Sequence, residues 1–409
     1  MKQYPKYKDS GVSWIGEIPE GWETLKLKFL CSYFQAGSNL TSFQIKPEGT
    51  YSVYGGNGIR GYFDEYNWDG GCNLIGRQGA LCGNVHLVKD KFWATEHAII
   101  IKANEKSSDD FLFYLMTAMN LNQYASQTAA QPGLAVDRIK QVKACCPPLP
   151  EQHAIVSYLD KKTAQIDRFI SEAEREIEKL NELKQAQIAH LVTHGLNSDV
   201  PMKNSGIVWI GQVPEHWEVR KMKFLFDERT EKNHPEEPIL CATQAHGVIP
   251  QSMYDNRVVV VNTGFQNLKF VEVGDFVISL RSFQGGIEYA HYQGIISAAY
   301  TILRSKGDLT NDYTRYLFKS FPFIQLLKTC VKGIREGQNI NYDMLKNNYL
   351  FVPPKQEQTA IVSAINSLNK RIDMLTSQLV DQINHLKELK QRIISDAVTG
   401  KIDVREVNN

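Results

Sequence analysis

The chain has 409 residues, of which 46 are Lys or Arg and 45 are Asp or Glu, so its formal net charge is only +1. Its apolar content of 43% and charged content of 22% are typical of a soluble globular protein, and its length suggests roughly two to four domains. The polar N-terminal residues and the lack of a long apolar run exclude a signal peptide and a membrane span, which predicts a cytoplasmic protein.

The first element along the chain is a motif that occurs twice. Residues 10–30 read SGVSWIGEIPEGWETLKLKFL and residues 205–225 read SGIVWIGQVPEHWEVRKMKFL, with 13 of 21 positions identical. We call this repeated segment the frame motif. The sequences that follow the two copies are largely unrelated. A duplicated frame that holds two divergent inserts indicates a molecule that grips two different ligands at a fixed separation.

The two inserts extend over about residues 25–145 and 220–350. Both alternate short β-rich runs with glycine-rich turns and then become helical. This pattern predicts a mixed α+β fold in each insert. Strands are predicted at residues 73–75, 85–88, 98–102, 257–261, 275–279 and 295–303, and helices at residues 110–123 and 310–328.

Polar turns in the inserts contain the candidate ligand-binding residues. The glycine-rich segment 54–61 lacks the G-x-G-x-x-G order and a following helix, so it indicates a close backbone approach rather than a nucleotide-binding loop. An Arg and a Gln follow a predicted strand in each insert, and these side chains match guanine and adenine edges in the DNA major groove. The alternative for each residue is a solvated loop position. The candidate DNA contacts are Asn57, Arg60, Arg77, Gln78, Gln127, Thr128, Gln131, Arg281, Ser282, Gln284, Arg335, Gln338 and Asn339.

A long amphipathic segment follows each insert. Apolar residues recur at steps of three and four from residue 151 to about 193 and from 356 to about 398, without an internal Pro or Gly. Prolines precede both segments, and Gly195 and Gly400 follow them. We predict two long helices that pack as an antiparallel coiled coil, although two bundle helices without a spacing role would show the same periodicity. The predicted seam comprises Ile166, Ile170, Ile177, Leu180, Ile372, Leu375, Leu379 and Leu386.

The linker between the two halves resembles the two ends of the chain joined together. Its first residues, from Gly195, are similar to residues 400–404, and its last residues are similar to residues 6–11. The organisation is therefore cyclic, with a pseudo-twofold axis. We expect the N- and C-termini to lie close together.

Motifs that would indicate catalysis are absent from the sequence. The Pro-Pro pairs at 147–148 and 353–354 lack the acceptor and aromatic residues of a methyltransferase base-binding loop, and no ATP-binding loop or H-E-x-x-H motif occurs. Glu96-His97 suits a structural histidine better than a catalytic one. The seven cysteines lack zinc-site spacing, which favours buried reduced thiols. We therefore predict neither catalytic nor metal-binding residues in this chain.

Several motifs together resemble the specificity subunit of type I restriction-modification systems. They are the double frame motif, the P-P-x-x-E-Q-x-A-I-V segment before each long helix, and insert segments such as IGRQGALCGNVH, SLRSFQGGIEYA and GIREGQNINYDMLKNNYLFVPP. The resemblance covers essentially the whole chain. It implies two target-recognition domains, each of which reads one half of a bipartite, asymmetric site in double-stranded DNA, and paired helices that set the spacer between the halves.

The resemblance also implies partners. Two methyltransferase subunits would dock on the helices, and restriction subunits would join them. S-adenosylmethionine, ATP and magnesium would belong to those subunits, with no cofactor in this non-catalytic chain. The implied domains are residues 1–150 and 195–353, each with a frame motif and a target-recognition domain, and the helical segments 151–194 and 354–409. From the residues alone, two other functions stay open: a self-sufficient DNA methyltransferase or nuclease, and a duplicated adaptor that does not bind DNA.

Overall fold

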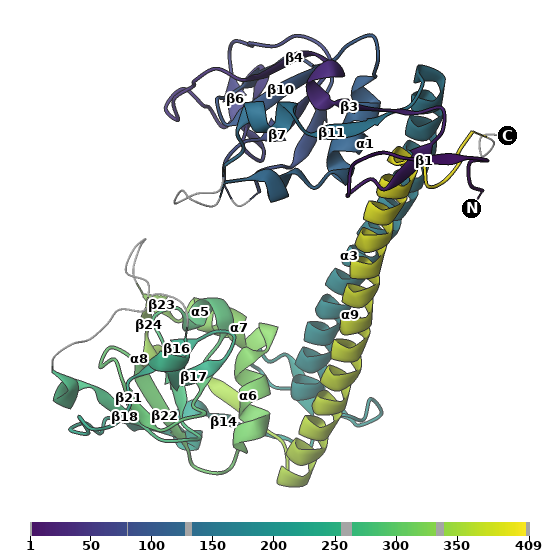
Figure 1. Ribbon diagram of the computed structural model, residues 1–409. Helices are drawn as coiled ribbons and strands as arrows, with labels where there is room; N and C mark the ends of the chain where they lie inside the picture. The colour runs from purple at the N-terminus through teal and green to yellow at the C-terminus, as the bar shows by residue number, and fades with distance from the viewer. Residues whose placement is uncertain (1, 80, 127–132, 255–263, 333–338, 406–409) are drawn as a thin grey trace. The chain divides into compact units, whose positions relative to one another are not determined.

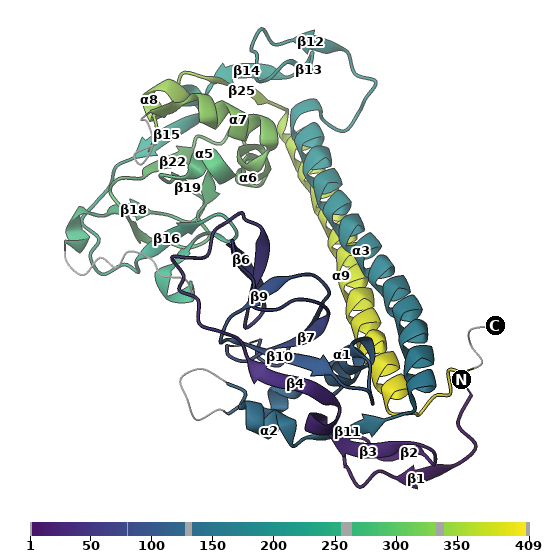
Figure 2. The ribbon, with the colours of Figure 1, turned by 90° about the horizontal axis from the view of Figure 1, so that it is seen from above.

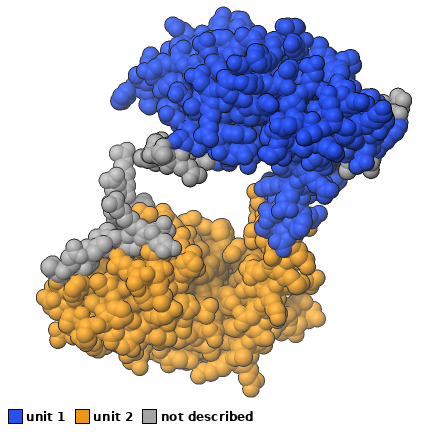
Figure 3. Space-filling view, in the orientation of Figure 1, with its two compact units in different colours: residues 1–174, 380–409 blue, residues 175–379 orange. Residues whose placement is uncertain are grey.

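The structure is a computed structural model that describes residues 2–79, 81–126, 133–254, 264–332 and 339–405. It divides into two compact units, coloured blue and orange in Figure 3. Unit 1 comprises residues 1–174 and 380–409, and unit 2 comprises residues 175–379. Each unit therefore contains one frame motif, one insert and a part of each long helix.

Short, mostly antiparallel strands form the sheets of unit 1. The frame motif gives a hairpin of β1 (Tyr7–Asp9) and β2 (Glu17–Pro19), and then β3 (Glu23–Lys26), which pairs with β11 (Lys143–Cys146) at the far end of the insert. The remaining strands are β4 (Cys31–Ala36), β5 (Tyr51–Gly55), β6 (Gly58–Phe63), β7 (Cys72–Gly76), β8 (Val85–Val88), β9 (Phe92–Ala94) and β10 (Ala98–Ala103). They form a four-stranded sheet in the order β4-β10-β7-β8 and a three-stranded sheet in the order β6-β5-β9.

Helix α1 (Asp109–Ala118) packs on the four-stranded sheet. Its Phe111 and Leu115 are completely buried in one core with Ile75 of β7 and Ile99 of β10. A central strand that is buried on both faces consists of a continuous run of apolar residues. For this reason β7 and β10 could be recognised in the sequence. The strands predicted at 73–75, 85–88 and 98–102 are confirmed.

The helix predicted at residues 110–123 ends earlier than expected. It stops at Ala118, and Asn120 adopts a left-handed backbone with φ of 48°. Asparagine tolerates this conformation better than most residues, so it can end a helix whose periodicity continues. A separate 3-10 turn over Leu121–Tyr124 and the short helix α2 (Val136–Lys140) follow.

Unit 2 repeats this plan. Its strands are β12 (Met202–Asn204), β13 (Gln212–Pro214), β14 (Glu218–Lys221), β15 (Phe226–Arg229), β16 (Leu240–Thr243), β17 (Gly247–Pro250), β18 (Lys269–Val271), β19 (Phe276–Ile278), β20 (Glu288–Tyr289), β21 (Gly294–Ile296), β22 (Thr301–Ser305), β23 (Val331–Lys332), β24 (Asn339–Ile340) and β25 (Tyr349–Val352). The four-stranded sheet has the order β15-β22-β19-β20, which corresponds strand for strand to β4-β10-β7-β8. Pairs β12–β13 and β14–β25 correspond to β1–β2 and β3–β11. The short helices are α4 (Met222–Leu225), α5 (Ser282–Gly285) and α8 (Tyr342–Leu345).

Two predictions for the second insert are wrong in detail. The single strand predicted at 295–303 is β21 and β22, which belong to different sheets and are separated by a turn in which the Tyr300 amide donates to the Ser297 carbonyl at 3.1 Å. The single helix predicted at 310–328 is α6 (Asn311–Lys319) and α7 (Phe321–Thr329). Pro322 lies in the first turn of α7, where its missing N–H does not matter, and it cannot continue α6. Strand β19 confirms the strand predicted at 275–279, and residues 257–261 lie outside the described part of the chain.

Two long helices pack together along their length (Figures 1 and 2). They are α3 (Leu149–His194) and α9 (Lys355–Val398), close to the predicted bounds. In unit 1, Ile155 near the start of α3 shares a core with Ile393 near the end of α9. In unit 2, Val192 near the end of α3 shares a core with Ile361 near the start of α9. The helices are therefore antiparallel, as predicted, and the eight predicted seam residues are all buried or half-buried.

Ion pairs on the helices follow the same symmetry. In unit 1, Lys390 Nζ lies 2.7 Å from an oxygen of Asp167. In unit 2, Lys184 Nζ lies 2.8 Å from an oxygen of Asp373. Each residue of the second pair is matched by one of the first at a sequence offset of 206. Because the aspartates are exposed, each pair adds at most about 1 kcal/mol and serves mainly to fix helix register.

The frame motif is anchored to the start of a long helix in each unit. Trp22, which is 1% exposed, donates through Nε1 to Glu151 at 2.9 Å, and Trp217 donates to Glu357 at 3.0 Å. A buried indole needs a partner for its N–H, and the first turn of a helix is a favourable place for a carboxylate. The Glu of the repeated P-x-x-E-Q segment therefore anchors the frame motif to the first turn of the long helix.

The Gln of the same segment holds the insert. Gln152 is completely buried and donates to the carbonyl groups of Lys106 and Pro147 at 2.8 and 2.9 Å. Its Oε1 accepts from the amide of Ser108, the N-cap of α1, at 3.0 Å. Gln358 makes the equivalent contacts in unit 2.

The two ends of the chain meet in unit 1, as the cyclic organisation predicts (Figure 1). The Asp403 amide donates to the Lys2 carbonyl at 2.9 Å, and the Tyr7 hydroxyl donates to the Gly400 carbonyl at 3.1 Å. Gly400 has φ of 74°, and an added Cβ would collide with Pro19 of the frame motif. A glycine is required there for both reasons.

Candidate nucleic-acid interface

Three loops of unit 1 meet around a cavity of about 400 Å³. They are the turn between β5 and β6, the segment that follows β7, and the residues that precede β10. We call this the loop cavity of unit 1. Its lining residues are Gly56, Asn57, Arg60, Gln78, Gly79, Leu81 and His97.

Backbone contacts hold the three loops together. The amide of Arg77 donates to the carbonyl of His97 at 2.8 Å. A Cβ on Gly56 would lie 2.7 Å from the carbonyl oxygen of Gln78, so the β5–β6 turn approaches the next loop as closely as only glycine permits. The close backbone approach predicted for the glycine-rich segment is confirmed, and its neighbour is the loop that follows β7, a strand of the other sheet.

The loop cavity brings together three of the residues predicted in the first insert. Asn57, Arg60 and Gln78 line it and are exposed. Arg77 is half-buried, and its Nη1 donates to the carbonyl of Glu96 at 3.4 Å, so its guanidinium supports the loop. The other predicted residues of this insert, Gln127, Thr128 and Gln131, lie outside the described residues.

Unit 2 has a corresponding loop cavity of about 550 Å³. The same three structural positions contribute to it: the turn between β16 and β17, the segment that follows β19, and the residue that precedes β22. Tyr254, beyond β17, and Glu288 of β20 line it as well. Its polar lining residues are Thr243, Gln244, His246, Tyr254, Ser279, Arg281, Gln284, Glu288 and Tyr300.

The residues predicted in the second insert divide into three groups. Arg281 and Gln284 are exposed and line the loop cavity. Ser282 is only 2% exposed, and its hydroxyl accepts from the amide of Ser279 at 2.8 Å, so it shapes the turn that presents Arg281. Asn339 is exposed on β24 and does not line this cavity. Arg335 and Gln338 lie outside the described residues.

Among the lining residues that were not predicted as contacts, one lies at an equivalent position in each unit. Ala98 pairs with Gly76 in unit 1 and Thr301 pairs with Ile278 in unit 2, so the residues just before them, His97 and Tyr300, occupy equivalent places. The sequence did carry a signal, because ATEHAII and SAAYTIL align at this point. His97 was interpreted as structural. Its Nε2 lies 3.2 Å from Glu96, whereas its Nδ1 has no hydrogen-bond partner among the described residues.

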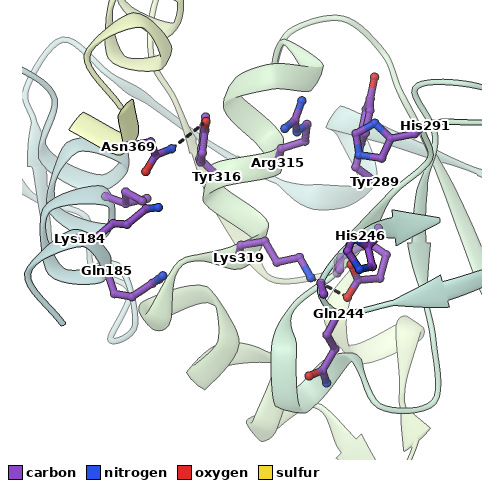
Figure 4. A pocket seen from close by; sticks show the side chains of 15 residues that line it. Lys184, Gln185, Gln244, His246, Tyr289, His291, Arg315, Tyr316, Lys319 and Asn369 are labelled. Carbon is purple, nitrogen blue, oxygen red and sulfur yellow. Dashed lines mark hydrogen bonds and ion pairs between the residues drawn. The ribbon is translucent and has the colours of Figure 1, made fainter. Parts of the chain in front are cut away.

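A second cavity, of about 360 Å³, adjoins the loop cavity of unit 2 and shares Gln244, His246 and Glu288 with it. We call it the helix-side cavity. Figure 4 shows Lys184 and Gln185 of α3 on one side and Arg315 and Lys319 of α6 facing the space, with Tyr289 and His291 opposite.

The cations of the helix-side cavity are paired to different degrees. Lys319 Nζ lies 2.6 Å from the buried Glu288 carboxylate, and Lys184 is paired with Asp373. Arg315 Nη1 lies 3.5 Å from Asp312, and its guanidinium stacks 5.2 Å from the Tyr289 ring. Arg315 is therefore the least tightly paired cation and the one best able to meet an anion.

The corresponding cavity of unit 1 is uncharged. It has about 520 Å³ and is lined by residues that include Asn84, His86, Phe113, Thr117 and Gln391. Counting from the N-caps of α1 and α6, Phe113 replaces Arg315 and Thr117 replaces Lys319. The two inserts therefore line corresponding cavities from the same helix positions, but among the described residues only the cavity of unit 2 carries charged side chains.

Burial sets the protonation state of several lining groups. It lowers the pKa of His86, and burial together with Arg315 lowers the pKa of His291, so both imidazoles are neutral near pH 7. Burial raises the pKa of Tyr300, whose hydroxyl therefore stays protonated and can donate a hydrogen bond. These groups suit recognition by hydrogen bonding.

In the part of the chain that the structure describes, no cluster of three or more His, Cys, Asp or Glu side chains is arranged to hold a metal ion. No helix within the described ranges is long and apolar enough to cross a membrane.

The fold and the cavities together define the class of protein. It has two mixed α/β domains with different polar cavities, and these domains alternate along the chain with two long antiparallel helices. A family model described as type I restriction modification DNA specificity domain matches residues 19–179 and again residues 214–385. The chain therefore belongs to this family, as a specificity subunit with two copies of the target-recognition domain.

Individual relatives agree with the family. The chain is 43% identical over 169 residues to the type I restriction enzyme EcoprrI specificity subunit of Escherichia coli, a match that covers 39% of this chain and 40% of that protein. It is 23% identical to the putative type I restriction enzyme MjaX specificity subunit of Methanocaldococcus jannaschii, with 99% of each chain covered.

Solved structures show the same fold. A chain from a study of assembly and conformational transition of the type I R-M system has a TM-score of 0.66 at 16% identity, with 94% of this chain and 99% of that chain covered. The HsdS subunit from Thermoanaerobacter tengcongensis has a TM-score of 0.50 at 17% identity, with 94% and 98% covered.

Proposed function

We propose that each loop cavity reads one half of a bipartite, asymmetric site in double-stranded DNA. The observation that supports this most is the pair of loop cavities, which have the same three-loop construction but different side chains. Asn57, Gln78 and His97 line the loop cavity of unit 1, whereas Arg281, Gln284 and Tyr300 line that of unit 2. Two equivalent sites with different chemistry suit two different half-sites, and hence a non-palindromic target.

The side chains of the loop cavities suit base edges. Arg forms paired hydrogen bonds to guanine and Gln or Asn to adenine in the major groove, while His and Tyr can each supply a single hydrogen bond. Arg315 of the helix-side cavity suits a backbone phosphate beside the second half-site. Phosphate contacts give salt-dependent affinity, and base contacts give selectivity.

The long helices are proposed to set the spacer between the half-sites. Each has 44 or more residues without a break and passes from one unit into the other. At about 1.5 Å per residue such a helix is a rod of roughly 70 Å, which keeps register where a flexible linker would not.

Partner subunits are proposed to supply the chemistry. Two methyltransferase subunits would dock on this chain, bind S-adenosylmethionine and methylate adenine at N6. Restriction subunits would add ATP- and magnesium-dependent translocation and cleavage in the cytoplasm. This chain itself would recognise DNA without catalysing a reaction.

Adding one heptad to both α3 and α9 tests the spacer role. The purified complex should then methylate a site with a longer spacer and unchanged half-sites, as read by methylation-aware sequencing. An unchanged spacer would show that the helices do not set it. The in-frame control inserts the same seven residues near Asn197 in the linker, which should leave the spacer unaltered.

Two simpler assays address the other functions. Binding of the purified chain to duplex DNA across a salt series should weaken steeply with salt, whereas an adaptor for proteins would show no such slope. Incubation of the purified chain alone with labelled S-adenosylmethionine and DNA should transfer no methyl group. Transfer would identify a self-sufficient methyltransferase.

A further inference from the structure

A glycine packs against a glutamine where two loops of each loop cavity meet. In unit 1 the glycine is Gly56, in the β5–β6 turn, and a Cβ there would lie 2.7 Å from the carbonyl oxygen of Gln78, in the segment that follows β7. In unit 2 the glycine is Gly285, in the segment that follows β19, and a Cβ there would lie 2.7 Å from Cδ of Gln244, in the β16–β17 turn. The two residue types have therefore exchanged loops between the units, and each cavity keeps one glutamine at this contact.

Gln244 presents an unused amide to the cavities of unit 2. It is exposed and lines both the loop cavity and the helix-side cavity (Figure 4). Its side chain has no hydrogen-bond partner among the described residues. In unit 1, by comparison, the side chain of Asn57 accepts from Asn84 Nδ2 at 2.9 Å. The donor and the acceptor of the Gln244 amide are therefore both available to a ligand.

The backbone beneath Gln244 is held in place. Gly285 ends α5, and its carbonyl accepts from Lys319 Nζ at 3.0 Å. The same Nζ lies 2.6 Å from the buried Glu288 carboxylate. Because Gly285 has no side chain, Gln244 lies directly against this turn, with Cγ, Cδ and Nε2 all 2.9 Å or less from where a Cβ would be. A side chain that rests on a fixed backbone loses less conformational entropy on binding than one that is free in solvent.

We propose that Gln244 selects an A·T pair in the second half-site and that Gly285 positions it for this contact. The proposal rests on the proposed function and names one base pair of its target. In the major groove, adenine offers N7 as an acceptor beside the N6 amino group as a donor, and a Gln amide matches both. Arg281 and Gln284 line the same loop cavity from the segment that follows β19, and Gln244 adds a contact from the opposite loop.

A DNA phosphate suits Gln244 less well than a base edge. Phosphate oxygens only accept hydrogen bonds, so a phosphate would use only the donor half of the amide, whereas adenine uses both halves. A cation binds phosphate more strongly than an amide does, and the helix-side cavity already supplies Arg315.

Competition binding by the purified full chain tests the proposal, with duplexes in which each base pair of the second half-site is changed in turn. Gln244→Ala should lose at least ~10-fold of the discrimination at one A·T pair and keep the discrimination at every other position. Gln244→Glu should move the preference at that position from adenine to cytosine, because a carboxylate accepts from cytosine N4 but cannot donate to adenine N7.

Gly285→Ala tests the positioning role. Gly285 lies in a helix and has no positive φ, so Ala fits its backbone and the fold should persist. The added methyl group displaces the Gln244 amide, so discrimination should fall at the same A·T pair. Combining Gly285→Ala with Gln244→Ala should cause no further loss, which a purely structural effect of the glycine would not reproduce. Gln266→Ala, at an exposed position outside both cavities of unit 2, is the control and should leave discrimination unchanged.

Several outcomes would overturn the proposal. Equal weakening of Gln244→Ala on all sequences would assign this residue to a phosphate. Unchanged discrimination, or a loss at a G·C pair, would remove the contact with adenine. Full discrimination by Gly285→Ala would remove the positioning role. A wild-type chain without any base selection in the second half-site would instead overturn the proposed function, and this result is distinguishable because it precedes any substitution.

Discussion

Replacing Gln358 by Ala is expected to destabilise unit 2 by about 3 kcal/mol. The side chain is completely buried and donates to the carbonyl groups of Asp308 and Pro353 at 2.9 and 2.8 Å. It also accepts from the amide of Thr310, the N-cap of α6, at 2.7 Å. A buried polar group left without a partner costs about 1–3 kcal/mol, and three such groups at the lower end of this range give about 3 kcal/mol.

Urea unfolding measures the loss, and amide hydrogen exchange localises it to α6 and the start of α9. Gln356→Ala is the control, because Gln356 is exposed in the same helical turn and its loss should change stability by no more than about 0.5 kcal/mol. Gln358→Glu should also destabilise, since a carboxylate cannot donate to the two carbonyl groups. Equal stabilities of Gln358→Ala and Gln356→Ala would refute the idea that this glutamine joins insert to helix.

Arg281→Ala should reduce the discrimination between bases at one position of the second half-site by ~1–3 kcal/mol. Arg304→Ala removes the same charge outside both cavities of unit 2 and should leave this discrimination unchanged. An equal loss of affinity for all DNA sequences would instead assign Arg281 to a contact with the DNA phosphate backbone. Arg315→Ala should reduce the salt slope of DNA binding by about one. Phe113→Ala, at the equivalent position in unit 1, should leave that slope unchanged. Equal slopes for the wild-type chain, Arg315→Ala and Phe113→Ala would contradict a phosphate contact by Arg315. A circular permutant opened near Asn197, with the native termini joined, should give the wild-type circular dichroism spectrum and DNA target; an unfolded permutant would argue against the cyclic organisation.

The long helices were predictable because a continuous apolar seam must repeat about every 3.5 residues over the whole length of each helix. The cyclic organisation was predictable for a similar reason, since the linker repeats the sequence of both termini. Strands such as β7 and β10 were found because both of their faces are buried. These features leave regular local patterns in the sequence.

Contacts between residues that are far apart in the sequence were harder to predict from the sequence. Nothing local indicates that Glu151 holds Trp22 or that Gln152 holds the start of α1, because those partners are far apart in sequence. The repetition of both residues in the two halves was the available signal. The breaks at Asn120 and Pro322 were missed because apolar periodicity continues across them.

The candidate site was predicted in part. Arg281, Gln284 and Gln78 were found because Arg and Gln after a strand have recognisable chemistry. His97 and Tyr300 were missed because the residue type differs between the inserts, and only the strand register shows that their positions are equivalent. A position that varies in type within a constant framework is where recognition is most easily changed.

The most direct test of two-part reading is replacement of residues 25–145 by the first insert of another specificity subunit, followed by methylation-aware sequencing of DNA modified by the reconstituted complex. The account predicts that one half-site changes while the other half-site and the spacer stay the same. A change in both half-sites, or a single continuous target in either protein, would contradict it.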